Sequence, residues 1–424
     1  ETLSAAFTNK EPQVRMVMGI PTVPMTDVEG RYVSAGKDYY VNEGKVTNPF
    51  ASYSNTVRRN KTVNVTGSLN IGLNLYKGLD YKLLLGGDYI STNNISRSIA
   101  FDSNWDENGN ADPDYSRTIN SLSESRGQRF SYTIDNILTY KNMFAGHTID
   151  AMVGTSWMRE YYRTMGIGSG STDLGGPNIT IFNGKGDITS EEYNSALLSF
   201  FARLNYDYKE RYLVSASIRS DKSSKFAKGN RVGYFPSVSV GWNIHEENFF
   251  NIEWISKMKI RASYGLSGNQ DIALYQTWPL MKQQNVILTG TPQIGYIPDR
   301  MGNDELKWET TSQFDFGVEA SFFKSRLNIE FDAYIKNTKD LLLDVEFPYT
   351  SGFKNGFMNV GKISNRGVEL MIRSTNISTN DFTWSTEFNI SHNRNEVVAL
   401  GPDKDFEYTF RPGLGNHPYT WLKV

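Results

Sequence analysis

One acidic stretch of the chain has a composition that could bind a metal ion. The segment WDENGNADPD covers residues 105–114, and from Asp106 to Asp112 every second side chain carries an oxygen atom. Loops that bind hard cations such as Ca²⁺ space their oxygen ligands in this way. Ala111, however, stands where an EF-hand-like loop requires glycine. A solvated, turn-rich loop is therefore favoured over a calcium site, and we predict no metal site.

No arrangement of residues indicates catalysis or a cofactor. The four histidines are scattered along the chain without the spacing of metal ligands. Gly166, Gly168 and Gly170 lack the spacing of a dinucleotide-binding fingerprint, and no helical pattern follows them. Neither a nucleophile with its base nor a pair of catalytic carboxylates can be argued from the sequence. We therefore predict no catalytic residue, no cofactor and a protein that is not an enzyme.

The residues best suited to hold a substrate lie in long polar connections. A site for a soluble oligomer combines aromatic faces with a few hydrogen-bonding groups, and loops carried on a rigid scaffold commonly supply both. Our candidates for substrate contact are Trp105, Asp106, Tyr275, Trp278 and Tyr296.

The elements that must position these loops are predicted to be β-strands. About a dozen stretches of roughly ten residues alternate apolar with polar side chains, which is the period of a strand with one apolar face. Between Val63 and Leu75 the apolar residues occupy odd positions, and between Phe314 and Phe322 they occupy even positions. These apolar sets contain no charge, as expected where a charged side chain facing lipid near the bilayer midplane costs about 2–4 kcal/mol.

The connections between these strands alternate in length. Short ones fall near residues 77–80, 141–147, 209–211, 246–256, 323–326 and 376–381, and longer ones near 91–127, 163–193, 220–232, 269–307 and 339–357. Membrane β-barrels have short turns on one side and long loops on the other. The strands of a soluble β-sandwich are shorter, and its connections do not sort in this way. We predict an all-β transmembrane antiparallel β-barrel.

Composition sets further limits. A net charge of −2 gives no electrostatic reason to propose nucleic acid as a partner. Cysteine is absent, which excludes disulfides and thiolate metal sites. No apolar run approaches the ~18 residues of a membrane helix. Aromatic residues recur where a strand meets a short turn, as in an interfacial girdle: Tyr81, Tyr140, Tyr206, Tyr208, Tyr212, Phe322 and Trp384.

The chain reads as part of a longer protein. It opens at Glu1 without a signal peptide. An open sheet edge in lipid leaves backbone groups unpaired at a cost of several kcal/mol each, so a spanning sheet must close on itself. We therefore expect missing sequence on both sides of residues 1–424.

Five segments between residues 195 and 400 carry a family resemblance: FARLNYDYKERYLVSASIRSDKSSKF (Phe201–Phe226), GYFPSVSVGWNIHEENFF (Gly233–Phe250), KIRASYGLSGNQDI (Lys259–Ile272), LKWETTSQFDFGVEASFF (Leu306–Phe323) and GKISNRGVELMI (Gly361–Ile372). They resemble, in family order, the SusC/RagA family of TonB-dependent outer-membrane transporters. VPMTDVEGRY (Val23–Tyr32) fits the same family more loosely.

The resemblance implies a barrel of about 22 strands with an N-terminal plug, placed in the lipid of the bacterial outer membrane. Residues 1–424 would then be a TonB-dependent receptor-like β-barrel domain that lacks the plug and the final strands. It also implies import of oligosaccharides or oligopeptides with a SusD-like surface lipoprotein, driven by the TonB complex through an N-terminal region absent from this chain. A passive outer-membrane porin and a soluble β-rich glycan-binding or adhesin module remain alternatives.

Two expectations concern the polar, lumen-facing side of the strands. Glycines at this parity either let an internal plug approach the wall or ease bending of the barrel. Glu319→Arg should be tolerated unless Glu319 pairs with the plug, whereas Val318→Arg on the apolar face should destabilise the barrel. The glycines are Gly72, Gly86, Gly154, Gly241, Gly265 and Gly317.

Overall fold

The computed structural model describes residues 26–27, 29–32, 49–103, 110–111, 116–117, 120–169, 187–288, 290–347, 349–353 and 355–400. Within these ranges the chain is almost entirely β-structure, accompanied by the helix α2 (Pro49–Ser54) and the 3₁₀ turns η1 (Ile244–Glu246) and η2 (Tyr349–Ser351). None of the helices in the described ranges is long and apolar enough to cross a membrane. The prediction of an all-β chain is confirmed.

Twelve strands form the main sheet, and they are longer than the sequence pattern predicts, at 12 to 24 residues each. They are β1 (Thr56–Tyr76), β2 (Leu79–Ser98), β3 (Ser121–Phe144), β4 (His147–Ser169), β5 (Asp187–Tyr208), β6 (Tyr212–Ser223), β7 (Val232–Asn243), β8 (Ile255–Asn269), β11 (Glu309–Phe322), β12 (Leu327–Lys339), β15 (Lys362–Ser378) and β16 (Thr383–Ala399). The extra length comes from the predicted long loops, where backbone pairing continues beyond the apolar alternation because each paired strand satisfies its neighbour's N–H and C=O groups.

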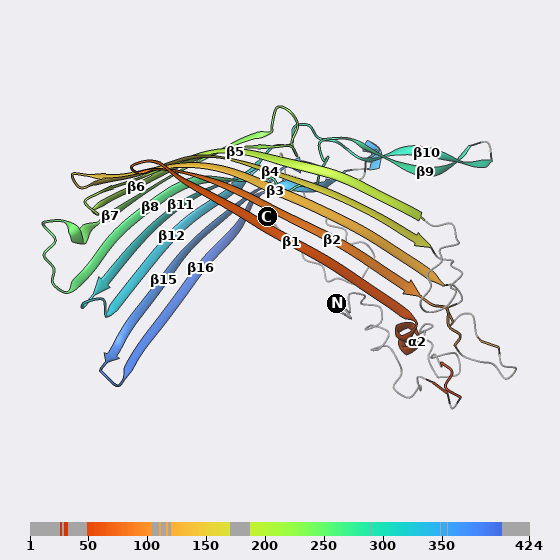
Figure 1. The fold of residues 1–424 in the computed structure, drawn as a ribbon, viewed down its shortest axis with the longest axis horizontal. Helices are drawn as coiled ribbons and strands as arrows, with labels where there is room; N and C mark the ends of the chain where they lie inside the picture. The colour runs from red at the N-terminus through yellow and green to blue at the C-terminus, as the bar shows by residue number, and fades with distance from the viewer. Residues whose placement is uncertain are drawn as a thin grey trace. The chain divides into compact units, whose positions relative to one another are not determined.

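The strands of the main sheet follow chain order, β1-β2-β3-β4-β5-β6-β7-β8-β11-β12-β15-β16. The gaps in this numbering arise because two long connections fold into separate hairpins. One is β9 (Leu280–Leu288) with β10 (Thr291–Arg300), and the other is β13 (Leu342–Glu346) with β14 (Asn355–Asn359). The β9–β10 hairpin extends past the ends of the strands that flank it in sequence (Figure 1).

The short connections lie where the sequence predicts them. β5 and β6 are joined through residues 209–211, and β11 and β12 through residues 323–326. The tightest turns use left-handed backbone, with φ of +84° at Gly146 and +51° at Lys209. Such φ values suit glycine and are adopted by other residues mainly in tight turns.

The chain divides into two compact units. The first draws on Glu1–Gly67, Gly86–Tyr132 and Glu160–Asn194, and the second on Ser68–Leu85, Thr133–Arg159 and Ser195–Val424. The first unit contains α2 and the parts of β1 to β5 that lead to the long connections. The second contains the remaining parts of those strands and all later elements.

One face of the sheet exposes large apolar side chains. On strands with a neighbour on each side, Phe314 is 46% exposed and Val240 is 51% exposed. A soluble β-sandwich would bury this face against a second sheet. An uncovered apolar face on long antiparallel strands instead fits a barrel wall whose outer surface meets lipid. We call this the apolar face, and its reverse, which carries Glu319 and its neighbours, the polar face.

Aromatic side chains gather at the short-turn end, as the sequence predicts. His147 lies 4.6 Å from Tyr208 between ring centroids, and its Nδ1 is 2.7 Å from the Tyr206 hydroxyl. At another turn Trp254 stacks on Phe322 at 5.6 Å. These groups have the place expected of an interfacial girdle.

The buried core of the second unit lies at the opposite, long-connection end. Phe226, Ile272, Leu306 and Trp308 are almost fully buried together, with Leu197, Phe235, Leu342 and Phe357 packed against them. Hydrogen bonds reinforce the cluster: Trp308 Nε1 donates to the carbonyl of Arg231 at 3.1 Å, and Lys225 Nζ to that of Ile272 at 2.9 Å. The cluster therefore joins three connections, β6–β7, β8–β11 and β12–β15, at the ends of the strands.

Candidate functional site

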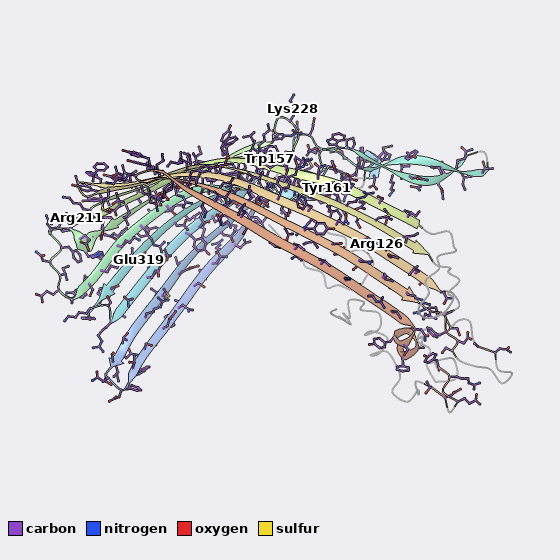
Figure 2. The ribbon with its side chains drawn as sticks, in the orientation of Figure 1. Arg126, Trp157, Tyr161, Arg211, Lys228 and Glu319 are labelled. Carbon is purple, nitrogen blue, oxygen red and sulfur yellow. The ribbon has the colours of Figure 1, made fainter. Side chains whose placement is uncertain are left out.

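The polar face carries an ion-pair network across β8, β11 and β12 of the second unit. Figure 2 labels Glu319, the β11 member of this network. The guanidinium of Arg261 on β8 lies 3.1 Å from Glu330 and 2.7 Å from Asp332, both on β12. Glu319 on β11 faces three cations of β8: Lys257 at 3.5 Å, Lys259 at 3.7 Å and Arg261 at 3.2 Å.

The register explains why this network needs cations on β8. Glu319 is directly opposite Glu330 of β12, and like charges opposite one another destabilise a sheet. On its other side Glu319 is opposite Lys259. Arg261 reaches across both carboxylates and so offsets their repulsion. The network continues along β11, where Asp315 accepts hydrogen bonds from Ser263 at 3.1 Å and Gln313 at 2.8 Å.

This network replaces the expectation that Glu319→Arg would be tolerated with the prediction that it destabilises the wall. That expectation assumed a carboxylate facing water, but Glu319 is a ligand of three cations within the wall itself. Arginine at this position would place a fourth cation among them. Alternation shows which face a residue occupies, whereas its cross-strand partners depend on register.

Beside the network the polar face is hollowed. A cavity of about 460 Å³ lies over β6 and β7, where small residues such as Ser215, Ser239 and Gly241 form the lining. Carboxylates of β4 and β5 line one side, and the cations of β8 line the other together with a carboxylate of β11, so the hollow presents both signs of charge. The charged lining residues are Asp150, Asp207, Asp315, Lys259 and Arg261.

Several glycines of the polar face make room for cross-strand side chains. A Cβ on Gly154 would lie 2.5 Å from the Phe201 ring, and one on Gly317 would lie 2.5 Å from the Asp332 carboxylate. Gly367, opposite Tyr334 in the register, would meet that ring at 2.5 Å. Gly72, in contrast, has nothing within 4 Å. For Gly154 and Gly317, local packing is thus a third explanation beside plug approach and barrel bending.

Two of the predicted substrate-contact residues share one turn at the base of the β9–β10 hairpin. The Tyr275 carbonyl accepts hydrogen bonds from the Trp278 N–H at 3.1 Å and from Arg300 Nη2 at 2.9 Å. Tyr275 has a φ of +59°, a backbone strain that such contacts must hold in place. The Trp278 side chain is 67% exposed.

The other predicted residues lie apart from this turn. Tyr296 is on β10, opposite Gln283 of β9, and its ring is open to solvent. Trp105 and Asp106 lie outside the described residues, as does most of the 105–114 loop weighed for calcium. In the described ranges, no group of three or more His, Asp or Glu side chains is placed to hold a metal ion.

A carboxylate with altered acidity lies at the short-turn end. Glu247 accepts hydrogen bonds from the Tyr212 hydroxyl at 2.5 Å and from Trp242 Nε1 at 3.1 Å. Arg211 Nη1 lies 3.4 Å from the same carboxylate. These contacts, the tyrosine hydroxyl foremost, hold the pKa of Glu247 below its ordinary value. The cluster fastens the β5–β6 turn to the β7–β8 connection.

Comparison with known protein families explains why the sheet has one apolar face and one polar face. The model of the family described as TonB dependent receptor-like, beta-barrel matches residues 23–414. The chain belongs to that family. Its relatives place it in the SusC/RagA type and in the bacterial outer membrane.

Two named relatives in this family align with different fractions of the chain. TonB-dependent receptor P39 of Formosa agariphila is 33% identical over 93% of the chain, which spans 37% of that protein. TonB-dependent receptor SusC of Bacteroides thetaiotaomicron is 34% identical over 53% of the chain and is covered over 23% of its own length.

Solved structures agree with the family. The RagAB peptide transporter matches with a TM-score of 0.74 and 27% identity, over 89% of this chain and 41% of the matched chain. The chain thus spans about two fifths of the length of that receptor.

Sequence reasoning missed the two features that depend on long-range pairing. The ion-pair network could be suspected only from charged residues at alternate positions in β8, β11 and β12, since nothing local shows which of them meet. The Phe226 cluster had a weak signal, because Phe226 and Trp308 are large apolar residues in or beside polar connections. Both features follow from register rather than from any motif.

Proposed function

We propose that the complete protein is an outer-membrane importer of nutrient oligomers that works with a SusD-like surface lipoprotein and is driven by TonB. Membership of the TonB-dependent receptor-like family across residues 23–414 carries this proposal. The chain would be one section of the barrel wall, with the plug and the final strands contributed by sequence outside residues 1–424. A transporter of this kind is not an enzyme, so no catalytic group is required of the wall.

Three observations support a barrel whose interior holds protein or ligand and through which a substrate passes. The polar face is charged and structured by fixed ion pairs, including Arg261–Asp332 at 2.7 Å. It contains a hollow of about 460 Å³ with both signs of charge. The apolar face, in contrast, exposes residues such as Phe314 and Val240. This distribution suits a wall with lipid outside and polar contents inside.

The substrate is proposed to be an oligosaccharide or an oligopeptide. The related solved structure is titled a peptide transporter, which describes that protein. In this chain, exposed aromatic rings beside hydrogen-bonding groups suit either class of oligomer. The proposed contacts remain Trp105, Asp106, Tyr275, Trp278 and Tyr296.

The experiment is uptake by cells that carry the full-length receptor and its neighbouring lipoprotein. Growth is measured on defined oligosaccharides and oligopeptides, with and without an intact TonB. The expected result is growth on one class that requires TonB. Uptake that persists without TonB would favour a passive porin, and absence of the protein from the outer-membrane fraction would favour a soluble module.

A paired substitution tests the proposed contacts. Trp278→Ala with Tyr296→Ala should weaken uptake at low substrate concentration by removing two exposed aromatic faces. Lys282→Ala is the matched control, because Lys282 lies on the opposite side of the same hairpin in an exposed ion pair with Asp299 at 3.4 Å, and such pairs contribute little. Equal uptake by the aromatic variant and the control would remove these residues from the site.

A further inference from the structure

The β9–β10 hairpin has two outer edges, and in the described part of the chain neither edge is paired with another strand. β9 and β10 form a sheet of their own with two members (Figure 1). A hairpin of two strands is at best marginally stable in water. The N–H and C=O groups along its outer edges are therefore open to any chain that can pair with them.

Two prolines show which residues point toward these edges. Opposite residues of an antiparallel ladder alternate between pairs that exchange both hydrogen bonds and pairs whose N–H and C=O groups point outward. Pro292 and Pro298 have no N–H to exchange, so both belong to the outward kind. The register is continuous between them. The outward positions of β9 are therefore those opposite the even-numbered residues of β10, namely Met281, Gln283, Asn285 and Ile287.

The two edges differ in how they are protected. Natural edge strands are protected from pairing by prolines, charged side chains or bulges. β10 has prolines at outward positions and a register shift between Pro298 and Arg300. β9 has neither a proline nor a charged residue at its outward positions. The outer edge of β10 is thus closed to a further strand, and that of β9 is open.

The open edge borders a face of the hairpin that exposes apolar side chains. Residues directly opposite one another share a face, so the outward residues of β9 lie beside Ile294 and Tyr296 of β10. Ile287 is 76% exposed and Tyr296 is 68% exposed, and Met281 and Ile294 are also open to solvent. A strand added to β9 would place every second side chain on this same face. It would bury apolar surface while it completed the main-chain hydrogen bonds.

The spacing of the open groups favours a peptide as the added strand. The outward N–H and C=O groups recur at every second residue of β9, about 6.6 Å apart. An extended peptide presents complementary C=O and N–H groups at the same repeat, which is the basis of recognition by strand addition. The hydroxyl groups of an oligosaccharide do not alternate one donor with one acceptor along a backbone. The edge is therefore complementary to an oligopeptide and not to a glycan.

We propose that the outer edge of β9 binds an extended oligopeptide as a third strand of the hairpin, through the main-chain groups of Met281, Gln283, Asn285 and Ile287. This rests on the proposed import function and narrows its substrate to oligopeptides at least as long as Met281–Ile287. Because the main chain supplies the hydrogen bonds, many sequences can bind. The exposed apolar side chains favour peptides with apolar residues at alternate positions.

The test is binding of size-selected tryptic peptides of casein to the purified full-length receptor with its lipoprotein. Amide hydrogen exchange, resolved by residue, is compared with and without the peptides. Exchange should become slower at Gln283, Asn285 and Ile287, because their N–H groups gain partners. Linear dextrins of matched length should leave these amides unchanged.

Proline substitution removes one outward N–H and keeps the inward pairing, as Pro298 does on β10. Asn285→Pro should weaken peptide binding roughly 10-fold, since the lost hydrogen bond leaves a carbonyl of the peptide without its donor. Asn285→Ala is the matched control, because it removes the carboxamide and keeps the N–H, and it should bind as the wild type does. Gln283→Pro and Gln283→Ala repeat the comparison. Slow exchange at Gln284 and Val286, which pair toward β10, shows that each variant forms the hairpin.

A modified ligand tests the same contacts without any variant. A peptoid with the side chains of the best-retained peptide has no backbone N–H, and it should bind the wild type at least ~10-fold more weakly than that peptide. Equal loss in the proline and alanine variants, equal binding of the peptoid, or absence of peptide binding would overturn the proposal. Slower exchange at Gln283 and Asn285 with dextrins would also overturn it. The same change caused by the lipoprotein without peptide would show that the lipoprotein fills the edge, with the same consequence.

Uptake by cells separates this proposal from the import function. TonB-dependent uptake of the peptides that is equal in wild type and Asn285→Pro would contradict the β9 site and leave the import function standing. Slower exchange along β9 together with uptake that persists without TonB would contradict the import function and leave the site.

Discussion

Val318 and Glu319 are adjacent residues of β11 with opposite surroundings. Val318 is on the apolar face, and Glu319 is held by Lys257, Lys259 and Arg261 on the polar face. A substitution at either position is therefore harmful for its own reason. At Val318 a new charge would lose its hydration in lipid. At Glu319 a new cation would be repelled by the cations of a partly hydrated network.

Val318→Arg should lower the free energy of unfolding by about 2–4 kcal/mol if the position lies near the bilayer midplane. Glu319→Gln should cost about 1 kcal/mol or less, because its ion pairs are partly exposed to solvent, and Glu319→Arg should cost more. Urea unfolding in lipid vesicles at low and high salt separates the causes. Salt should reduce the Glu319 effects and leave the Val318 effect unchanged; the reverse pattern would contradict the assignment of faces.

The Glu247 contacts predict a pH dependence at the short-turn end. Its pKa is lowered in the folded protein from an ordinary 4.5, chiefly by the Tyr212 hydroxyl. The folded state therefore binds fewer protons than the unfolded state in this window, and its stabilisation is full above pH 4.5 and lost as pH falls through the lowered pKa. Unfolding of wild type and Glu247→Gln should differ at pH 7, and the difference should shrink as the pH falls below 4.5 and through the lowered pKa. A constant difference across that range would exclude the carboxylate as the cause.

At the scale of elements, a glycine on one strand makes room on the polar face for a large side chain of the neighbouring strand. Gly367→Ala should destabilise the barrel by about 1–3 kcal/mol, since its Cβ would meet the Tyr334 ring at 2.5 Å and force it to move. Gly72→Ala is the matched control, with open space around the new methyl group. Thermal unfolding of both variants checks this, and equal midpoints would show that the ring moves without cost.

The connection between β8 and β11 has two parts with different roles. Its ends are structural, because Ile272 and Leu306 belong to the buried Phe226 cluster. Its middle, the β9–β10 hairpin, exposes Ile287, Ile294 and Tyr296. A loop defined from sequence as residues 269–307 therefore joins a core segment to a projecting hairpin.

Removal of residues 281–299 with a short glycine linker should leave assembly intact, whereas removal of residues 269–307 should prevent it. The physical reason is that only the longer deletion takes Ile272 and Leu306 out of the core, at a cost of about 2–5 kcal/mol for each large residue. Heat-modifiable mobility of the receptor in outer-membrane fractions reports assembly. Failure of the shorter deletion to assemble would show that the hairpin is part of the fold.

At the scale of the whole molecule, the two ends of the strands are predicted to face different compartments. Short turns such as the one at Lys324 are expected in the periplasm and long connections outside the cell. Protease added to intact cells should cut the β9–β10 hairpin near Gly290 and spare Lys209 and Lys324. Cleavage at the lysines should appear only after the outer membrane is opened. Cutting at Lys209 in intact cells would reverse the orientation.

The sequence by itself determined the strands, their two faces and the positions of the short turns. These are local properties, because the alternation of apolar and polar residues has the period of the strand itself. The same reasoning gave the girdle aromatics and, through five matching segments, the family. Each of these needs only residues that are neighbours along the chain.

The tertiary structure decided which residues meet across strands. The contact of Arg261 with Asp332, the Tyr334 ring over Gly367, and the burial of Phe226 with Leu306 join residues between 33 and 80 positions apart. A shift of one residue in register would exchange the faces and replace every such partner. Register is set by pairing along the whole strand and by the turns that join the strands. The ion-pair network, the glycines that make room for cross-strand side chains and the attachment of the β9–β10 hairpin to the buried core could therefore be assigned only once the sheet was in place.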